Sequence, residues 1–299
     1  MENQRKKKRG DRKDGYLLRD IDSMHKFTPY LLPDRVANEA CMSELTELSA
    51  VNRYLEKKNA DNPEFKYTMF HVICAAIAKT VILRPKLNYF ISGKKMYERK
   101  DILFSFVVKK KFADNGAEAL AIVKIDRESD EAPIEQIYSK VKKIVYSVRK
   151  ENKQDGTTDF MDFFTSLPAP ILNLVTKLLF WMDRHGKLPD SLVKEDPYSS
   201  TVFLSNLGSI KMSADYHHLT NWGTNSIFVI IGEKKLYPFY DENGNVTMKE
   251  AVRSGWTIDE RIADGFYFAN SLKILRRILA DPDILDMPLS APLPEEAHA

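Results

Sequence analysis

The sequence predicts one mixed α/β domain, built from a mixed β-sheet flanked by helices. Apolar residues at helical spacing alternate along the chain with short runs of β-branched and aromatic residues, which indicates helices and strands in turn. The segment Asp-Glu-Asn-Gly-Asn at 241–245 separates two strand-like runs, as the turn of a β-hairpin does. Neither an internal repeat nor a long linker interrupts the 299 residues, 43% of which are hydrophobic, so one large core is expected.

The first half of the chain contains two clear helical patterns. Residues 67–85 carry apolar side chains at helical spacing, with Thr68 as the expected N-cap and Pro85 as the stop. Residues 133–151 carry a second, amphipathic pattern. The other elements expected in this half are a strand at 37–47, a short helix at 48–59, strands within 87–112 and a strand at 119–126.

The second half predicts three strands and a final helix. A strand is expected at 200–210, and the hairpin strands are expected at 226–240 and 246–259. The last helix should follow at 265–282, where Pro282 stops it.

Both ends and one internal segment depart from this alternation. Residues 1–15 are strongly basic and are expected to form a disordered, solvated tail, with an arm for nucleic acid or an anionic membrane as the alternative. Residues 287–299 are rich in proline and are also expected to be disordered. The folded domain is then 16–286, and it includes an apolar insertion at 150–183. We expect residues 160–182 of this insertion either to cover or extend a substrate channel or simply to pack on the core.

Composition excludes several kinds of protein. The net charge of +3 identifies no partner by itself, and we expect no nucleic-acid partner. Two cysteines, Cys41 and Cys74, are too few for a disulfide framework and are not spaced as zinc ligands, which fits a reducing, cytoplasmic compartment. No metal-ligand spacing appears elsewhere, so no metal is expected. No secretory signal and no run of 18 apolar residues is present, so we expect no membrane-spanning helix.

Three short segments occur in an order that is found in a known protein family. The chain reads RPKLNYFI at 84–91, SNLG at 205–208 and DERIADG at 259–265, and a helical pattern follows the last of them. Over roughly residues 24–285, this order resembles the catalytic domain of the acyltransferase subunit of 2-oxo-acid dehydrogenase complexes, which shares its fold with chloramphenicol acetyltransferase. The resemblance implies a chloramphenicol acetyltransferase-like sheet flanked by helices and a homotrimer with its active sites between subunits.

The resemblance also implies roles for individual residues. The family's histidine in His-x-x-x-Asp-Gly is the general base, and here Glu260 stands in its place. Asp264 would be the structural aspartate of the motif, held by a nearby arginine or lysine, and Gly265 would be its tight turn. Ser205 would donate a hydrogen bond to the oxyanion, and its neighbour Asn206 would contact substrate. A coenzyme A (CoA) thioester would enter one end of a channel and the acceptor the other.

Glutamate in place of histidine changes the chemistry. A histidine that takes a proton becomes positive and attracts the negative intermediate, whereas a glutamate only becomes neutral. At ~4 Å and an effective dielectric near ~20, that attraction is worth about 4 kcal/mol. An ordinary glutamate, with a pKa of about 4.3, is also a weaker base than a histidine at about 6.5. Burial raises the pKa of carboxyl groups, so Glu260 stays a candidate base.

Three other histidines deserve notice. His217 and His218 lie in the loop after the strand of Ser205, so one of them could reach the channel; the alternative is a polar surface loop. His71 falls within an apolar helical pattern and is expected to be a partnered core residue.

Two functions stay open on this sequence. One is a CoA-dependent acyltransferase with an unknown acceptor, and the other is a catalytically inactive trimeric scaffold or interaction protein. The chain shows no lipoyl domain and no small subunit-binding domain, which argues against the ordinary subunit of a large dehydrogenase complex. A third version is an acyltransferase at an anionic membrane surface, with the basic N-terminus and residues 160–182 as contacts.

Overall fold

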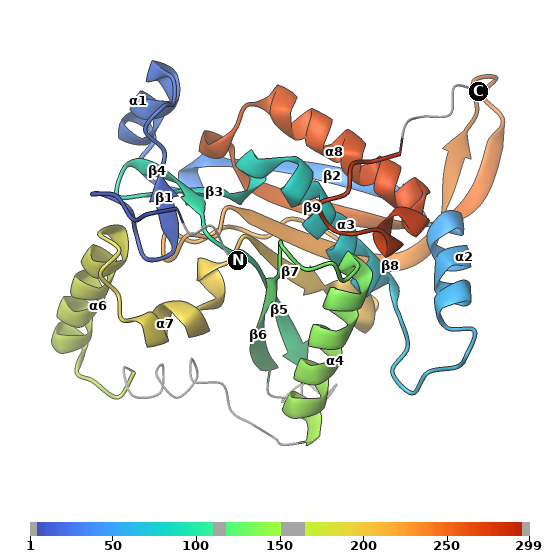
Figure 1. The fold of residues 1–299 in the computed structure, drawn as a ribbon, viewed down its shortest axis with the longest axis horizontal. Coiled ribbons are helices and arrows are strands. Elements are labelled where there is room, and N and C mark those ends of the chain that lie inside the picture. Colours follow the sequence, from blue (N-terminus) through green and yellow to red (C-terminus); the bar gives the residue numbers. More distant parts are fainter. Residues whose placement is uncertain (1–4, 110–117, 151–164, 295–299) are drawn as a thin grey trace.

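The computed structural model of the chain describes residues 5–109, 118–150 and 165–294 (Figure 1). Its centre is a six-stranded sheet in the order β2-β9-β8-β7-β5-β6. β7 pairs parallel with both β5 and β8, whereas the other pairs are antiparallel, so the predicted mixed sheet is confirmed. The strands are β2 (Glu39–Glu47), β5 (Ile102–Lys109), β6 (Glu118–Ile125), β7 (Val202–Asn206), β8 (Ile227–Tyr240) and β9 (Val246–Asp259).

A second, three-stranded antiparallel sheet lies beside the first, in the order β1-β4-β3. It consists of β1 (Gly15–Leu17), β3 (Tyr89–Ser92) and β4 (Lys95–Arg99). The far halves of β8 and β9 project from the large sheet as a two-stranded hairpin (Figure 1).

Helices cover one face of the large sheet and enclose the main core. Of these, α3 packs against both α4 and α8, and all three helices contribute to the core that they share with the sheet (Figure 1). On the opposite side of the molecule from α2 and the hairpin lie α6 and α7 (Figure 1). The helices are α1 (Ser23–Leu31), α2 (Ser49–Lys58), α3 (Met69–Leu83), α4 (Pro133–Lys150), α6 (Ala169–Arg184), α7 (Asp190–Glu195) and α8 (Gly265–Ala280). Short 3₁₀ turns are η1 (Val36–Asn38), η2 (Pro85–Asn88), η3 (Pro197–Ser199), η4 (Leu207–Ile210), η5 (Glu260–Ile262) and η6 (Pro282–Asp286).

The central helix, α3, begins and ends where the sequence predicts. Thr68 precedes its first turn, and the backbone N–H of Thr68 donates to Nδ1 of His71 at 3.0 Å, so the side chain three residues on reaches back as in a capping box. Pro85 follows its end. Every residue from His71 to Val81 is buried, because both the sheet and the neighbouring helices pack on this helix.

A buried charge cluster fixes the end of β9. Asp259 accepts two hydrogen bonds from Arg261, both at 2.7 Å, and lies 3.6 Å from Nε of Arg35. Arg261 also donates to the carbonyl oxygen of Leu32, which ties the chain after α1 to η5. Removing one member would leave a charge buried without its partner, so the cluster makes the DERIADG segment rigid.

Both predicted tails need correction over the residues that the structure describes. Arg12 is buried, and its guanidinium donates to Ser92 Oγ at 2.8 Å and to the carbonyl oxygen of Asp183 at 2.6 Å. At the other end Leu289 is fully buried, and the buried Lys79 donates to the carbonyl oxygens of Pro288 and Ala291. These segments are held by partners far away in the sequence. Residues 1–4 and 295–299 lie outside the described residues.

Of the predicted insertion at 150–183, the structure describes Lys150, which is the last residue of α4, and residues 165–183. Its helix α6 is anchored at its end, where Asp183 accepts a hydrogen bond from the backbone N–H of Gly223 at 3.2 Å. Phe180 meets Trp222 edge to face. The outer side of the helix leaves a stripe of large apolar side chains exposed: Ile171, Leu174, Leu178 and Trp181.

Candidate functional site

A cavity of about 520 Å³ opens where the parallel strands β5 and β7 end. The start of α3 and the side of α4 form its apolar wall, and the last residues of β7 with η4 form its polar wall. Its borders include Phe70, His71, Phe106, Ser205, Asn206 and His217. In sheets that contain parallel strands, the carboxyl ends of those strands are a usual place for ligands.

The cavity passes around the end of the sheet because β7 stops at Asn206. Side chains alternate along a strand, and Leu204 belongs to the core under the helices, whereas Phe203 belongs to a smaller cluster on the other face. Ser205 therefore faces the side of Phe203, and Asn206 faces the helices. Residues from both faces of the sheet border one continuous space.

The Ser205 hydroxyl is available to a ligand. It is half-buried, and no side chain or backbone group of the described residues forms a hydrogen bond with it. A neighbouring hydroxyl in the same cavity, that of Ser209, donates to the carbonyl oxygen of Asn206 at 2.8 Å. Ser205 is thus not satisfied locally, although short polar side chains commonly are.

Gly208 lets the chain turn sharply after β7. A Cβ atom at this position would lie 2.4 Å from the carbonyl oxygen of Gly232, which no side chain can tolerate. The two backbones approach each other there, and η4 is thereby pressed against β8 at the edge of the cavity.

His217 reaches this cavity and the ring of His218 does not border it. The His217 ring stacks on Phe228 at 4.2 Å between centroids and 9° between planes. Its Nδ1 lies 2.8 Å from the carbonyl oxygen of His218. Of the two histidines that the sequence indicated, the structure therefore brings one next to the space that Ser205 borders.

His71 is a buried, neutral member of the cavity wall. Its Nδ1 accepts the hydrogen bond from the Thr68 backbone, so the ring proton is on Nε2. Nε2 has no hydrogen-bond partner among the described residues. Burial lowers the pKa of His71 to about 4. The expectation of a partnered core histidine is therefore met at Nδ1 only.

Glu260 lies at the other end of the sheet from this cavity. Ser205 pairs with Ile230, which pairs with Gly255, and Glu260 follows five residues later in the chain. At about 3.3 Å per residue and about 4.8 Å per strand, Glu260 and Ser205 lie roughly 15–20 Å apart within one chain. Glu260 is exposed, and no hydrogen bond or ion pair to it is found among the described residues.

Asp264 and Gly265 differ from the expectation. Asp264 is the N-cap of α8, where its carboxylate accepts the backbone N–H of Tyr267 at 2.8 Å, and this bond lowers its pKa. The predicted arginine or lysine partner is wrong: no ion pair to Asp264 occurs in the described residues, and Lys86 acts only from a distance. Gly265 has open space around it and no positive φ, so it is the first residue of α8 and not a tight turn.

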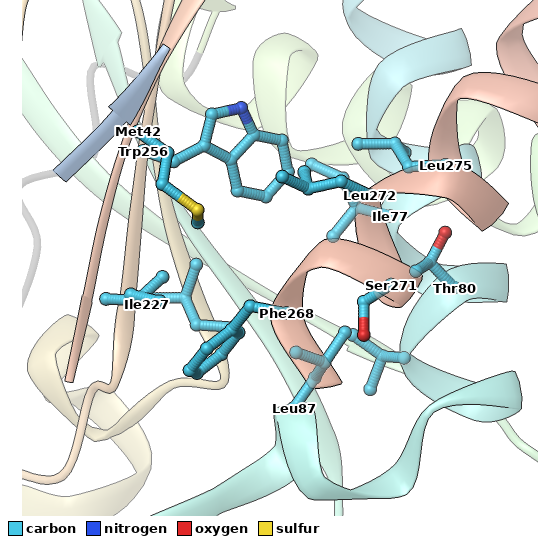
Figure 2. Close-up of a pocket in the computed structure, with 12 residues that line it drawn as sticks. Met42, Ile77, Thr80, Leu87, Ile227, Trp256, Phe268, Ser271, Leu272 and Leu275 are labelled. Atoms are coloured by element: carbon cyan, nitrogen blue, oxygen red, sulfur yellow. The ribbon is translucent and has the colours of Figure 1, made fainter. Parts of the chain in front are cut away.

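A second, much smaller cavity lies inside the core, and it is not a ligand site (Figure 2). Its volume of about 30 Å³ is close to that of one water molecule. Figure 2 shows Met42 and Trp256 from the sheet on one side and Leu272 and Leu275 of α8 on the other. The hydroxyl of Ser271 donates to its own helix. This is a packing gap between the helices and the sheet.

The described part of the insertion does not border the larger cavity. Its helix α6 lies against Arg12 and Trp222 instead, so the prediction that this part covers the channel is wrong. Residues 151–164 lie outside the described residues. Within the described ranges, no helix combines the length and apolar content that crossing a membrane requires. Among these residues no group of three or more histidine, cysteine or acidic side chains could hold a metal ion.

Comparison with solved structures identifies the fold. A probable dihydrolipoamide acetyltransferase from Listeria monocytogenes superimposes with a TM-score of 0.57 at 15% identity, covering 94% of this chain and 97% of the other. The chain has the fold of the dihydrolipoamide acetyltransferase core. Chloramphenicol acetyltransferase also superimposes, with a TM-score of 0.50 at 12% identity over 91% of this chain and 99% of the other. The predicted resemblance in fold is confirmed.

A third solved structure is similar as well. The dihydrolipoamide acetyltransferase from Azotobacter vinelandii superimposes with a TM-score of 0.56 at 13% identity, covering 90% of this chain and 93% of the other. In that enzyme a serine, a histidine and an asparagine have been investigated for their role in catalysis. No protein-family model and no curated protein matches this sequence. At these identities the likeness establishes the fold alone.

Sequence reasoning missed that the start of α3 and the side of α4 form the cavity wall. The apolar spacing of both helices predicts burial, but a residue on a buried face gives no sign of facing a hollow. The one available signal was His71 itself, a polar residue three positions after an N-cap threonine.

The neutral state of His71 predicts how stability depends on pH. Its pKa is about 4 in the folded protein and about 6.5 in an unfolded chain, so the unfolded state holds more protons between these values. The free energy of unfolding should therefore rise with pH from 4 to 6.5 and keep its full value above. Of the wild-type rise in the free energy of unfolding across this range, up to about 3 kcal/mol comes from His71. His71→Phe should lack this part of the rise, as measured in denaturant titrations at several pH values.

The exposed His218 provides the control, because His218→Gln should keep the wild-type slope. An unchanged slope in His71→Phe would show that His71 is not held neutral by burial.

Proposed function

We propose that this chain transfers an acyl group from a CoA thioester to an acceptor in the cavity at the end of β7. One observation carries the proposal: the Ser205 hydroxyl, which has no hydrogen-bond partner among the described residues, borders a cavity of about 520 Å³ in a fold shared with acetyltransferases. Cavities of about 300–1,000 Å³ commonly bind small molecules. The aromatic and aliphatic wall suits an acyl chain or the pantetheine arm, and the polar wall suits the thioester.

The reaction needs a donor for the oxyanion. When the acceptor's oxygen, sulfur or nitrogen adds to the thioester carbon, the carbonyl oxygen becomes negative, and the Ser205 hydroxyl donates to it. The tetrahedral intermediate then collapses, the C–S bond breaks, and CoA leaves as a thiolate that takes up a proton. Asn206 lies on the helix side of the same space, where it can contact the rest of the substrate.

The proposal has two versions, which differ in where the acceptor's proton goes. In the first, the protein is a homotrimer, and Glu260 of a neighbouring subunit reaches this cavity; the glutamate would then replace the family's histidine. In the second, a group of the same chain takes the proton. The distance between Glu260 and Ser205 within one chain makes the first version depend entirely on assembly.

Exposed apolar side chains near Glu260 support assembly. Phe266, in the first turn of α8, is 79% exposed, and α1, which packs against η5, exposes Met24, Phe27 and Leu31. An exposed apolar surface of this kind next to the motif supports a subunit interface there.

We therefore expect light scattering to give about three times the chain mass of 34.4 kDa. Phe27→Asp combined with Leu31→Asp should shift the protein toward monomer, because charges would enter an apolar contact. Leu174→Asp, on the distant helix α6, is the matched control and should leave the trimer intact. A wild-type monomer at micromolar concentration would contradict the trimer and the first version with it.

The oxyanion role of Ser205 is tested by Ser205→Ala. We expect the turnover rate with acetyl-CoA to fall about 100-fold, while the melting temperature stays the same. Turnover is measured as the release of free CoA. Ser209→Ala is the control, because Ser209 borders the same cavity but its hydroxyl is already bonded to the backbone. Equal rates in wild type and Ser205→Ala would remove Ser205 from the mechanism.

The competing proposal is a catalytically inactive trimeric scaffold on the same fold. The observation that favours it is that Glu260 is exposed and forms no hydrogen bond or ion pair among the described residues. A scaffold has no need of acyl-CoA, so absence of thermal stabilisation by acetyl-CoA, longer acyl-CoAs and free CoA would favour it.

A membrane contact is a further part of the proposal. Leu174, 70% exposed, lies in the apolar stripe of α6, and the basic residues 5–9 precede Arg12, which is anchored beside the end of that helix. Apolar side chains next to basic ones are typical of helices that lie on anionic lipid surfaces. We propose that α6 contacts such a surface from the cytoplasm, where free cysteines such as Cys41 and Cys74 persist.

Flotation with phosphatidylserine-containing vesicles tests this contact. We expect the wild type to float. The double variant Leu174→Ser and Leu178→Ser should not float, and neither should a variant in which Lys6, Lys7 and Lys8 are all neutralised. Leu236→Ser, on the exposed hairpin, is the control. A wild type that stays at the bottom of the gradient would rule the membrane contact out.

A further inference from the structure

We propose that His217 is the general base of the transfer and that the site is therefore complete within one chain. This inference rests on the proposed acyl transfer and decides between its two versions. Among the described residues, His71 and His217 are the histidines that border the cavity. Which ring nitrogen carries the proton decides between them.

A base needs a ring nitrogen with a free lone pair. His71 fails this requirement, because its Nδ1 accepts the Thr68 backbone N–H and its Nε2 carries the proton. His217 meets it. Its Nδ1 lies 2.8 Å from the His218 carbonyl oxygen, which can only accept, so Nδ1 is the protonated nitrogen and Nε2 carries the lone pair.

The surroundings of His217 hold its ring in place. Phe228 lies flat against it, and the His218 carbonyl fixes its rotation through Nδ1. A base that a third group orients in this way is the arrangement used by many nucleophilic and acyl-transfer enzymes.

His217 lies on the face of the sheet that Ser205 faces. Phe228, under the His217 ring, pairs with Phe203, two residues before Ser205 on the neighbouring strand. The backbone positions of Phe228 and Ser205 are therefore about 8 Å apart, because they are separated by two residues along a strand and by one strand spacing. A thioester between the two side chains could meet the Ser205 hydroxyl at its oxygen and the His217 lone pair at the attacking atom.

The step balances without any further reactant. Nε2 takes the proton from the acceptor as its O, S or N atom bonds to the thioester carbon, and Ser205 donates to the oxyanion. When the C–S bond breaks, the imidazolium returns the proton to the CoA sulfur. The positive ring stands near the negative intermediate, which is the attraction that a glutamate cannot supply.

The test compares four variants with acetyl-CoA as donor and dihydrolipoamide or water as acceptor, and follows the loss of thioester. His217→Gln and His217→Phe should each lower kcat about 100-fold or more, with little change in KM or melting temperature. His217→Phe keeps a ring on Phe228, which separates lost chemistry from lost packing. His218→Gln, which keeps the carbonyl group, and Glu260→Gln should both retain most of the activity. The rise of kcat with pH that the imidazole produces should be present in the wild type and absent in both His217 variants.

Chemical modification gives a readout that does not depend on finding the right acceptor. Diethyl pyrocarbonate acylates unprotonated imidazole nitrogens, so it should modify His217, and acetyl-CoA should protect it.

Full activity in His217→Gln would overturn the inference. So would modification of His217 at an unchanged rate in the presence of bound acetyl-CoA. Loss of activity in Glu260→Gln alone would assign the base to the neighbouring subunit instead. Failure of acetyl-CoA to bind or react with the wild type would refute the proposed function itself, and the inference with it.

Discussion

The parallel pairing of β7 between β5 and β8 is the constraint on which the site depends. β7 has five residues and β8 has fourteen, so the sheet loses a strand abruptly after Asn206. The close approach of Gly208 to Gly232 then turns the chain away against β8. No side chain of the described residues fills the hollow beyond the last residues of β7, and the hollow joins the two faces of the sheet. The side chains of Ser205 and Asn206 border one space only because the strand ends there.

The same topology explains why Glu260 stands apart. β9 runs antiparallel to β8, so its last residue lies beside the first residues of β7 and β8, at the opposite end of the strands from Asn206. The buried pair of Asp259 and Arg261 holds this end rigidly, and Asp264 starts α8 as an N-cap. Each of these residues has a structural task that the fold requires. Glu260 is exposed and forms no hydrogen bond or ion pair among the described residues, so a change at this position costs the fold little. The DERIADG segment can thus persist for structural reasons whether or not Glu260 takes part in catalysis.

The sequence predicted the elements well and the long-range contacts poorly. α3 was predictable because Thr68, Pro85 and the apolar spacing between them are local signals. The two tails were expected to be disordered because charge and proline are also local signals, yet Arg12 and Lys79 find carbonyl partners more than 170 residues away in the chain. Such partners leave no trace in a window of a few residues.

The site was predictable in part for the same reason. Ser205 was indicated by the segment SNLG, and His217 by its place after that strand. Which of His217 and His218 borders the cavity depends on the path of an irregular loop, and no spacing rule decides it. The apolar content of α6 indicated burial over the channel, but the helix lies elsewhere because Asp183 and Phe180 anchor it near Gly223 and Trp222.

The central claim is that one cavity, at the end of β7, holds the thioester. A crystal structure of the protein with a stable ketone analogue of acetyl-CoA tests it most directly. The ketone oxygen should lie within about 3.2 Å of Ser205 Oγ, with the His217 ring on the opposite side of the carbonyl carbon. An analogue bound away from the end of β7, or with its ketone oxygen turned from Ser205, would contradict the account.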